Sequence, residues 1–184
     1  RAHAQIGLVI AGETGLRFAE GDMRFVLGSL ALIQGVHADA HAFLSESASI
    51  YAQLGDQASL SRSHALLAWT ARGSGPPGSV REHLVESLKH AVAGRSFLSF
   101  LWALPAVGLY LLDEGQAERA LELHALASCY PFVSNSFWFQ DMVGREVSDV
   151  VAALPHDALA DIEERGRVQD LEATASELLA ELER

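Results

Sequence analysis

The sequence predicts an all-α protein, a right-handed α-solenoid of antiparallel helix pairs that ends in a C-terminal capping helix. The first observation behind this prediction is a period of 40 residues that begins at Gly15. The second is that no tract shows the sustained alternation of apolar and polar residues that is typical of strands. Self-similarity over about 20–50 residues indicates stacked units that bury their apolar faces against one another.

Four columns of this period carry the same kind of residue in almost every unit. The first is apolar, the second is small, the third breaks helices and the fourth holds Ala or Val. They are Leu27, Leu67, Val107 and Val147; Gly28, Ala68, Gly108 and Ser148; Gly35, Gly75, Gly115 and Pro155; and Ala40, Val80, Ala120 and Ala160. A small residue allows two helices to cross at close range. Glycine adopts the left-handed conformation that ends many helices, and proline ends a helix because it lacks the amide hydrogen.

The period divides the chain into units over residues 15–54, 55–94, 95–134 and 135–169, each expected to be a helix, a short turn and a second helix. In the first unit the second helix is expected over residues 38–54, where Ala40, Leu44, Ala48 and Tyr51 share one helical face. In the third and fourth units Ser96 and Ser136 stand just before aromatic runs, so they are predicted N-caps.

Residues 96–112 carry no charged side chain, which raises the alternative of a membrane span. The tract is shorter than the ~20 residues that a bilayer core requires, and it contains Pro105. We therefore expect it to be the first helix of the third unit, apolar nearly all round because its neighbours bury it, and we expect no membrane partner.

Both ends of the chain extend the pattern. Residues 2–11 stand where the end of an earlier second helix would be, with Ala4 and Gly7 at packing columns. Asp170 is the predicted N-cap of a capping helix over residues 170–184, with its leucines on one side. We expect residues 1–184 to form a single repeat domain, the C-terminal fragment of a longer protein with further domains upstream.

Composition excludes several classes of function. The chain has 184 residues and a net charge of −11, with only 13 Lys and Arg, which argues against direct contact with nucleic acid. The single cysteine, Cys129, excludes an internal disulfide, and its context predicts a small buried apolar residue. No signal-peptide pattern is visible, so the cytoplasm is the expected location.

The order of apolar Leu27, small Gly28, turn Gly35, then Ala40, Leu44 and Ser47 resembles a tetratricopeptide repeat, and the third unit repeats most of it. The period of 40 departs from the usual 34, the early aromatic of the first helix is absent, and no proline closes the second helix. The sequence resembles the long, degenerate repeats at the C-terminal end of large bacterial signalling ATPases and transcriptional activators of the maltose-regulator type.

Catalytic and metal motifs are absent from the sequence: it has no phosphate-binding loop, no nucleophile elbow, no HExxH and no cysteine pair, so we expect neither an enzyme nor a cofactor. His37 and His41 are four residues apart, and His83, Glu86 and His90 share a helical face. Both groups could donate to a metal ion, but a solvated outer face is the favoured interpretation, because zinc needs convergent ligands. His124 replaces a packing leucine and is interpreted as a core histidine.

The resemblance implies that the first helices line a concave surface that binds a partner. The inner columns hold Phe25, Ser29, Arg62, Trp69, Arg72, Trp102 and Arg145, together with Leu32, Leu109, Met142 and Asp149. Arginine and tryptophan dominate binding hot spots, so this face could hold a protein or an acidic peptide. The alternative is that the tryptophans only pack against neighbouring units.

The sequence thus favours a non-catalytic scaffold domain of a bacterial signalling or transcriptional regulator, binding a peptide or a partner domain. The alternative function is a small-molecule sensor in such a regulator, which requires an enclosed cavity between helices.

Overall fold

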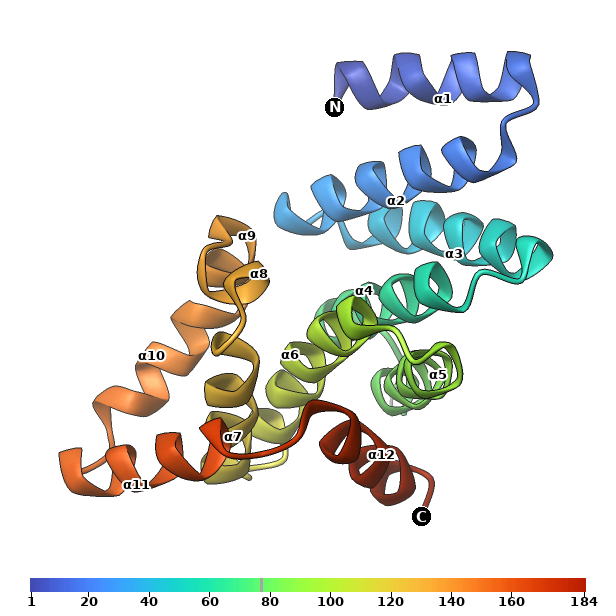
Figure 1. The fold of residues 1–184 in the computed structure, drawn as a ribbon. Helices are drawn as coiled ribbons and strands as arrows, with labels where there is room; N and C mark the ends of the chain where they lie inside the picture. The colour runs from blue at the N-terminus through green and yellow to red at the C-terminus, as the bar shows by residue number, and fades with distance from the viewer. Residues whose placement is uncertain (77) are drawn as a thin grey trace.

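A computed structural model describes residues 1–76 and 78–184, without the side chains of residues 74, 156 and 157. Within these residues the chain forms helices and turns but no strand, which confirms the all-α prediction. The first helices run back and forth across the molecule, from α1 at the top of Figure 1 to the green α4 and α5 near its centre.

The first five helices are joined by short turns. They are α1 (Ala2–Thr14), α2 (Arg17–Ile33), α3 (His37–Leu54), α4 (Gln57–Ser74) and α5 (Ser79–Gly94). Each of these helices packs against the one that follows it in the chain. The second helix of the first unit is α3, which begins one residue before its predicted start and ends at its predicted end, Leu54.

The second half of the chain is less regular. It contains α6 (Phe97–Asp113), α7 (Ala117–Ser128), the short α8 (Pro131–Ser134) and α9 (Phe137–Phe139), a π-helical turn η1 (Gln140–Gly144), α10 (Arg145–Ala152), α11 (His156–Arg167) and α12 (Leu171–Leu182). The helix α6 packs against α4, α5 and α7, and α7 packs against α11.

Glycine turns follow the predicted rule with one exception. Gly15, Gly35, Gly55 and Gly115 have φ angles of 69° to 74°, the left-handed conformation expected at helix ends. Gly75 instead has a φ of −78° and a ψ of 162°. It precedes Pro76, and the residue before a proline is pushed toward an extended backbone.

The predicted N-caps are confirmed. The side-chain oxygens of Ser96, Ser136 and Asp170 each accept a hydrogen bond from the backbone N–H three residues further on. These bonds satisfy donors that the first turn of a helix leaves unpaired.

The uncharged tract forms α6, as expected, and its residues supply much of the core. Leu101, Ala103, Leu104 and Val107 are fully buried among α4, α5 and α7. In the described part of the chain, no helix is long and apolar enough to cross a membrane.

The fourth unit departs from the expected helix pair, because its first helix is broken into α9, η1 and α10. Residues eight apart, such as Trp138 and Glu146, would lie about 80° apart around a regular α-helix. A π turn absorbs one extra residue, so the two side chains fall on nearly the same face. Both then reach α4, Trp138 at Trp69 and Glu146 at Arg72.

The last helix, α12, lies against α5 and α6 (Figure 1, dark red). Its predicted apolar side is confirmed, since Leu171, Ala175, Leu178 and Leu182 are buried. Arg81 of α5 ties the end of α12 down by donating from Nε to the Leu182 carbonyl at 2.8 Å.

The prediction for Cys129 is wrong. This residue is exposed at the end of α7, where its thiol lies 3.4 Å from the Ala125 carbonyl. The helix ends at Ser128, so Cys129 stands beyond the face that packs in the core.

Candidate functional site

The residues predicted to line a partner-binding face come from four helices. Phe25 and Ser29 lie on α2, Arg62, Trp69 and Arg72 on α4, Trp102 on α6 and Arg145 on α10. The structure gathers the aromatic members into one cluster and pairs Arg62 and Arg72 with carboxylates from other helices. Arg145 stays on the surface, where it pairs with Asp141 one turn earlier.

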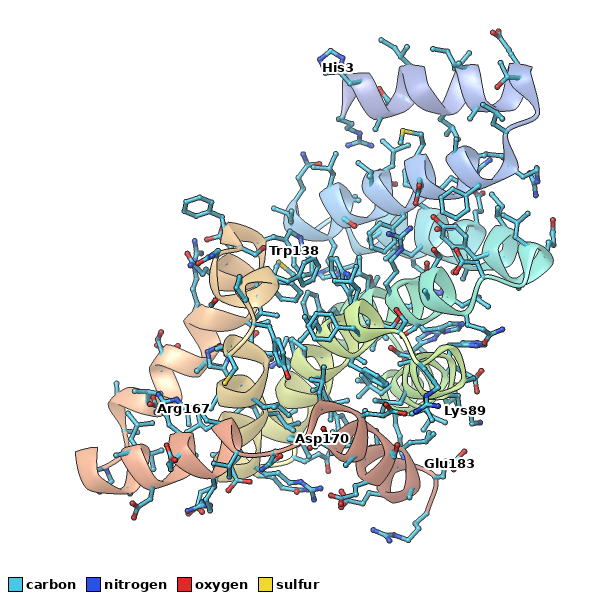
Figure 2. The ribbon with its side chains drawn as sticks, viewed as in Figure 1. His3, Lys89, Trp138, Arg167, Asp170 and Glu183 are labelled. Atoms are coloured by element: carbon cyan, nitrogen blue, oxygen red, sulfur yellow. The ribbon has the colours of Figure 1, made fainter. Side chains whose placement is uncertain are left out.

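Trp138, labelled in Figure 2, is the centre of the aromatic cluster. Its ring stacks on that of Trp69, with centroids 4.6 Å apart and planes 18° apart, and it lies 4.9 Å from that of Trp102. Phe139 adds contacts with both of these tryptophans. Trp69 is only 5% exposed, so it occupies the core position that the alternative interpretation gave it.

Trp102 also belongs to a row of three aromatic side chains and one leucine, part of which is exposed to solvent. It contacts Phe25 at 5.7 Å and Phe132 at 5.9 Å, and Leu98 lies one helical turn before it on the same side of α6. Leu98 is 51% exposed and Phe132 is 38% exposed. We call Phe25, Leu98, Trp102 and Phe132 the aromatic row.

Arg62 packs against Phe25, one of the members of the aromatic row. Its guanidinium lies over the Phe25 ring, 4.7 Å from the centroid, and forms an ion pair with Asp22. It also donates to the hydroxyl of Tyr51 at 2.9 Å. Burial, together with the Asp22 carboxylate, raises the pKa of Tyr51 to about 12. The charge of Arg62 is therefore balanced within the chain.

Arg72 is held between two carboxylates. Its guanidinium donates to both oxygens of Asp113 on α6, at 2.5 and 2.8 Å, and to both oxygens of Glu146 on α10. The hydrogen bonds to Asp113 and Glu146 raise the pKa of Arg72 above its ordinary value. Arg72 thus links three helices that are far apart in the sequence.

The last two predicted residues, Ser29 and Arg145, make polar contacts within one helical turn of themselves. The Ser29 hydroxyl donates to the carbonyl of Phe25 at 2.8 Å, within its own helix. The side chain of Arg145 is 80% exposed and pairs with Asp141 one turn earlier. The structure does not bring Arg145 to the aromatic cluster.

Sequence reasoning missed the groups that occupy this inner face, namely Trp138, Phe139 and Glu146, and the carboxylates Asp22 and Asp113. The aromatic run after Ser136 was visible in the sequence. Its contact with Trp69 was not, because that contact depends on how the fourth unit packs against α4.

The histidines form a second cluster, between α4 and α5. His64 and His83 place their Nδ1 atoms 3.3 Å apart, and His90 stacks on His64 with ring centroids 5.8 Å apart. The expected solvated outer face is therefore wrong for His83 and His90, which are partly buried against α4. Burial lowers the pKa of all three, that of His64 to about 4. Within the described residues, no group of three or more His, Cys, Asp and Glu side chains is placed to hold a metal ion.

Two small cavities flank His124 and Ser128 of α7, whose Nε2 and Oγ atoms are 3.5 Å apart. One, of about 190 Å³, lies beneath η1 and reaches Pro105 of α6. The other, of about 240 Å³, lies between α7, α10 and α11 and includes Cys129, Glu163 and Arg167. His124 is thus beside two spaces rather than fully packed in the core.

A third and wider hollow, of about 530 Å³, lies beside Trp69, Arg72 and Met142. It is open to solvent, and Leu32 and Leu109, two of the other inner-column residues, also line it. The surface beside these residues is therefore recessed, although Arg72 is already paired.

The chain matches no protein-family model, and the searches of curated proteins and of solved structures found no significant match.

Proposed function

We propose that this chain is a non-catalytic interaction domain, a right-handed tetratricopeptide-like solenoid that binds a protein partner on its concave face. The observation that carries the proposal is the aromatic row, in which Leu98 and Phe132 stay exposed beside Trp102. Exposed apolar side chains that adjoin one another are typical of binding surfaces, and partly buried aromatic rings are typical anchors.

The chemistry of the row suits an apolar segment. Arg62 and Arg72 are both ion-paired within the chain, so they do not supply the free positive charge that an acidic peptide would need. The net charge of −11 also repels an acidic partner at long range. We infer that the partner contributes a helix or extended segment with aromatic or aliphatic anchors, and that acidic residues in it are not required.

The setting that we propose follows from the sequence resemblance. A repeat region of a cytoplasmic bacterial regulator would use such a face to hold another protein or another domain of its own chain. The alternative function, sensing of a small molecule, would use the cavities beside His124.

Selection from a random peptide library displayed on phage tests the proposal, because it requires no candidate partner. We expect selected peptides to carry aromatic or aliphatic anchors and to bind the isolated chain. The variant Leu98→Asp places a charge in the row and should weaken such peptides at least tenfold, because a buried unpaired charge costs more than ~1.4 kcal/mol.

Val168→Asp is the matched control, since Val168 is 73% exposed, follows the end of α11 and is not a member of the row. Peptides that bind Leu98→Asp and Val168→Asp with equal affinity would show that the row is not the binding surface. Failure to select any peptide above background would count against the whole proposal.

A further inference from the structure

The smaller cavity beside His124 has the features of a ligand site. It lies beneath the π-helical turn. Its apolar lining is Pro105, Val133, Phe139 and Val143, and its polar lining is His124, Ser128, Ser134 and Gln140, with Gly144 beside them. Clefts of this kind, mostly apolar with a few convergent polar groups, are the usual form of small-molecule sites. We call it the π-turn cavity.

The polar side of the cavity can both donate and accept hydrogen bonds. Ser128 Oγ and His124 Nε2 lie 3.5 Å apart, a contact loose enough to be exchanged for a better one with a ligand. Burial lowers the pKa of His124, against a smaller opposing effect of Glu163. The ring is therefore neutral at pH 7 and has one donor and one acceptor nitrogen.

The charge of the lining restricts the ligand. No charged side chain lines the π-turn cavity in the described part of the chain. A carboxylate or an ammonium group would lose its hydration on entry without gaining an ionic partner, which is costly. The ligand must therefore be neutral.

The volume of the π-turn cavity restricts the size of the ligand. The π-turn cavity measures about 190 Å³. An apolar cavity of about 150 Å³ accommodates benzene, so this one holds a single ring with one small substituent. The ring would lie among Pro105, Phe139 and Val143, and the substituent would face Ser128 and His124.

We propose that the π-turn cavity binds a small neutral aromatic molecule with one hydrogen-bonding group, of the phenol class. This site is separate from the aromatic row and does not depend on it. The two are nevertheless neighbours, because Phe139 lines the cavity and its ring lies 5.2 Å from that of Trp102 in the row, and 4.9 Å from that of Trp138. Occupation of the cavity would therefore be reported by a change in tryptophan fluorescence.

Titration of the chain with phenol, followed by fluorescence and by ligand-observed NMR, tests this inference. Gly144→Leu should fill the cavity, because a Cβ at Gly144 would meet no atom nearer than 3.9 Å and the residue lines the space. Gly12→Leu is the matched control, a helical glycine of α1 with no atom within 4 Å of its Cβ position. Ser128→Ala removes the hydroxyl with little change in packing.

We expect saturable binding of phenol, weaker by at least tenfold in Gly144→Leu, unchanged in Gly12→Leu, and weaker by about three- to tenfold in Ser128→Ala, the effect of one lost hydrogen bond. Benzoate, which has the same ring and a negative charge, should not bind. If Gly144→Leu fails to fold, Ser128→Ala and benzoate decide the matter.

Absence of saturation with phenol would overturn the inference, as would equal affinity of phenol for folded Gly144→Leu and Gly12→Leu. Equal binding of benzoate would overturn the neutral class of ligand. None of these measurements involves a protein partner, so their failure leaves the proposed scaffold function untouched.

Discussion

At the scale of single residues, two glycines in the same column of the repeat have different surroundings. A Cβ at Gly28 would lie 2.6 Å from Leu44 Cγ and 3.3 Å from the Ala40 carbonyl. A Cβ at Gly108 would lie 3.7 Å from the Ala120 carbonyl, which is ordinary contact. The small column is therefore a steric requirement in the first unit and only a preference in the third.

Gly28→Ala and Gly108→Ala should consequently change stability in opposite directions. Alanine favours a helix over glycine by about 1 kcal/mol, so Gly108→Ala should raise the free energy of unfolding by up to that amount. In Gly28→Ala the clash with the fully buried Leu44 outweighs this gain, since overpacking costs about 1–3 kcal/mol. Urea denaturation of both variants measures the difference, and a stabilised Gly28→Ala would contradict the observed close packing of α2 on α3.

At the scale of elements, the broken helix of the fourth unit is held by aromatic contacts of α9 and by one ionic contact of α10. Trp138 stacks on Trp69. Glu146 forms an ion pair with Arg72, which also pairs with Asp113. Both contacts lead to α4, although α4 and α10 are separated by most of two units in the chain. The ionic contact is partly exposed, so it matters more for the position of α10 than for global stability.

Glu146→Gln should loosen the segment from α9 to α10. We expect faster amide hydrogen exchange in η1 and α10, with a loss of global stability below about 1 kcal/mol because the pair is partly solvated. Asp141→Asn is the control, since Asp141 pairs only with the exposed Arg145 and should leave exchange unchanged. Similar exchange in wild type and Glu146→Gln would show that Trp138 and Phe139 alone fix the segment.

At the scale of the whole molecule, the histidine cluster makes stability depend on pH. His64 faces His83, His90 and Glu86, and His83 also faces His41 and Glu82. Burial, reinforced by the neighbouring histidines, lowers the pKa of His64 to about 4 in the folded protein, against 6.5 for an ordinary histidine. Between these values the unfolded chain binds more protons, so acid favours unfolding.

The free energy of unfolding should therefore fall as the pH is lowered from 7 toward 4, by about 1–3 kcal/mol from His64 alone. The contribution of His64 to the free energy of unfolding is complete above pH 7. It is lost as the pH falls toward the pKa of His64 in the folded protein, about 4. In His64→Leu the slope between pH 7 and pH 5 should be shallower, whatever the stability of that variant at pH 7. Urea denaturation across this range checks the sign, and an equal slope in the two proteins would contradict the proposed role of His64.

The helical class, the position of most turns and the caps Ser96, Ser136 and Asp170 could be predicted from the sequence, because they depend on neighbours within a few residues. The cap Asp56 was not predicted. The period of 40 also placed α6 correctly in the core. The period did not predict the extended backbone of Gly75, which is set by Pro76. It also did not predict that Cys129 is exposed just beyond the end of α7.

The character of the candidate site depends on contacts between residues far apart in the chain, which the sequence does not show. The pairs Arg62–Asp22 and Arg72–Glu146 join residues 40 and 74 positions apart, and such contacts depend on how whole helices pack. The π-helical turn also shifts the register of α10 by one residue, which brings Glu146 to the same side of the helix as Trp138, toward α4. A periodic sequence can show which residues face inward, but whether an inward arginine is free or neutralised depends on side chains that only the fold brings to it.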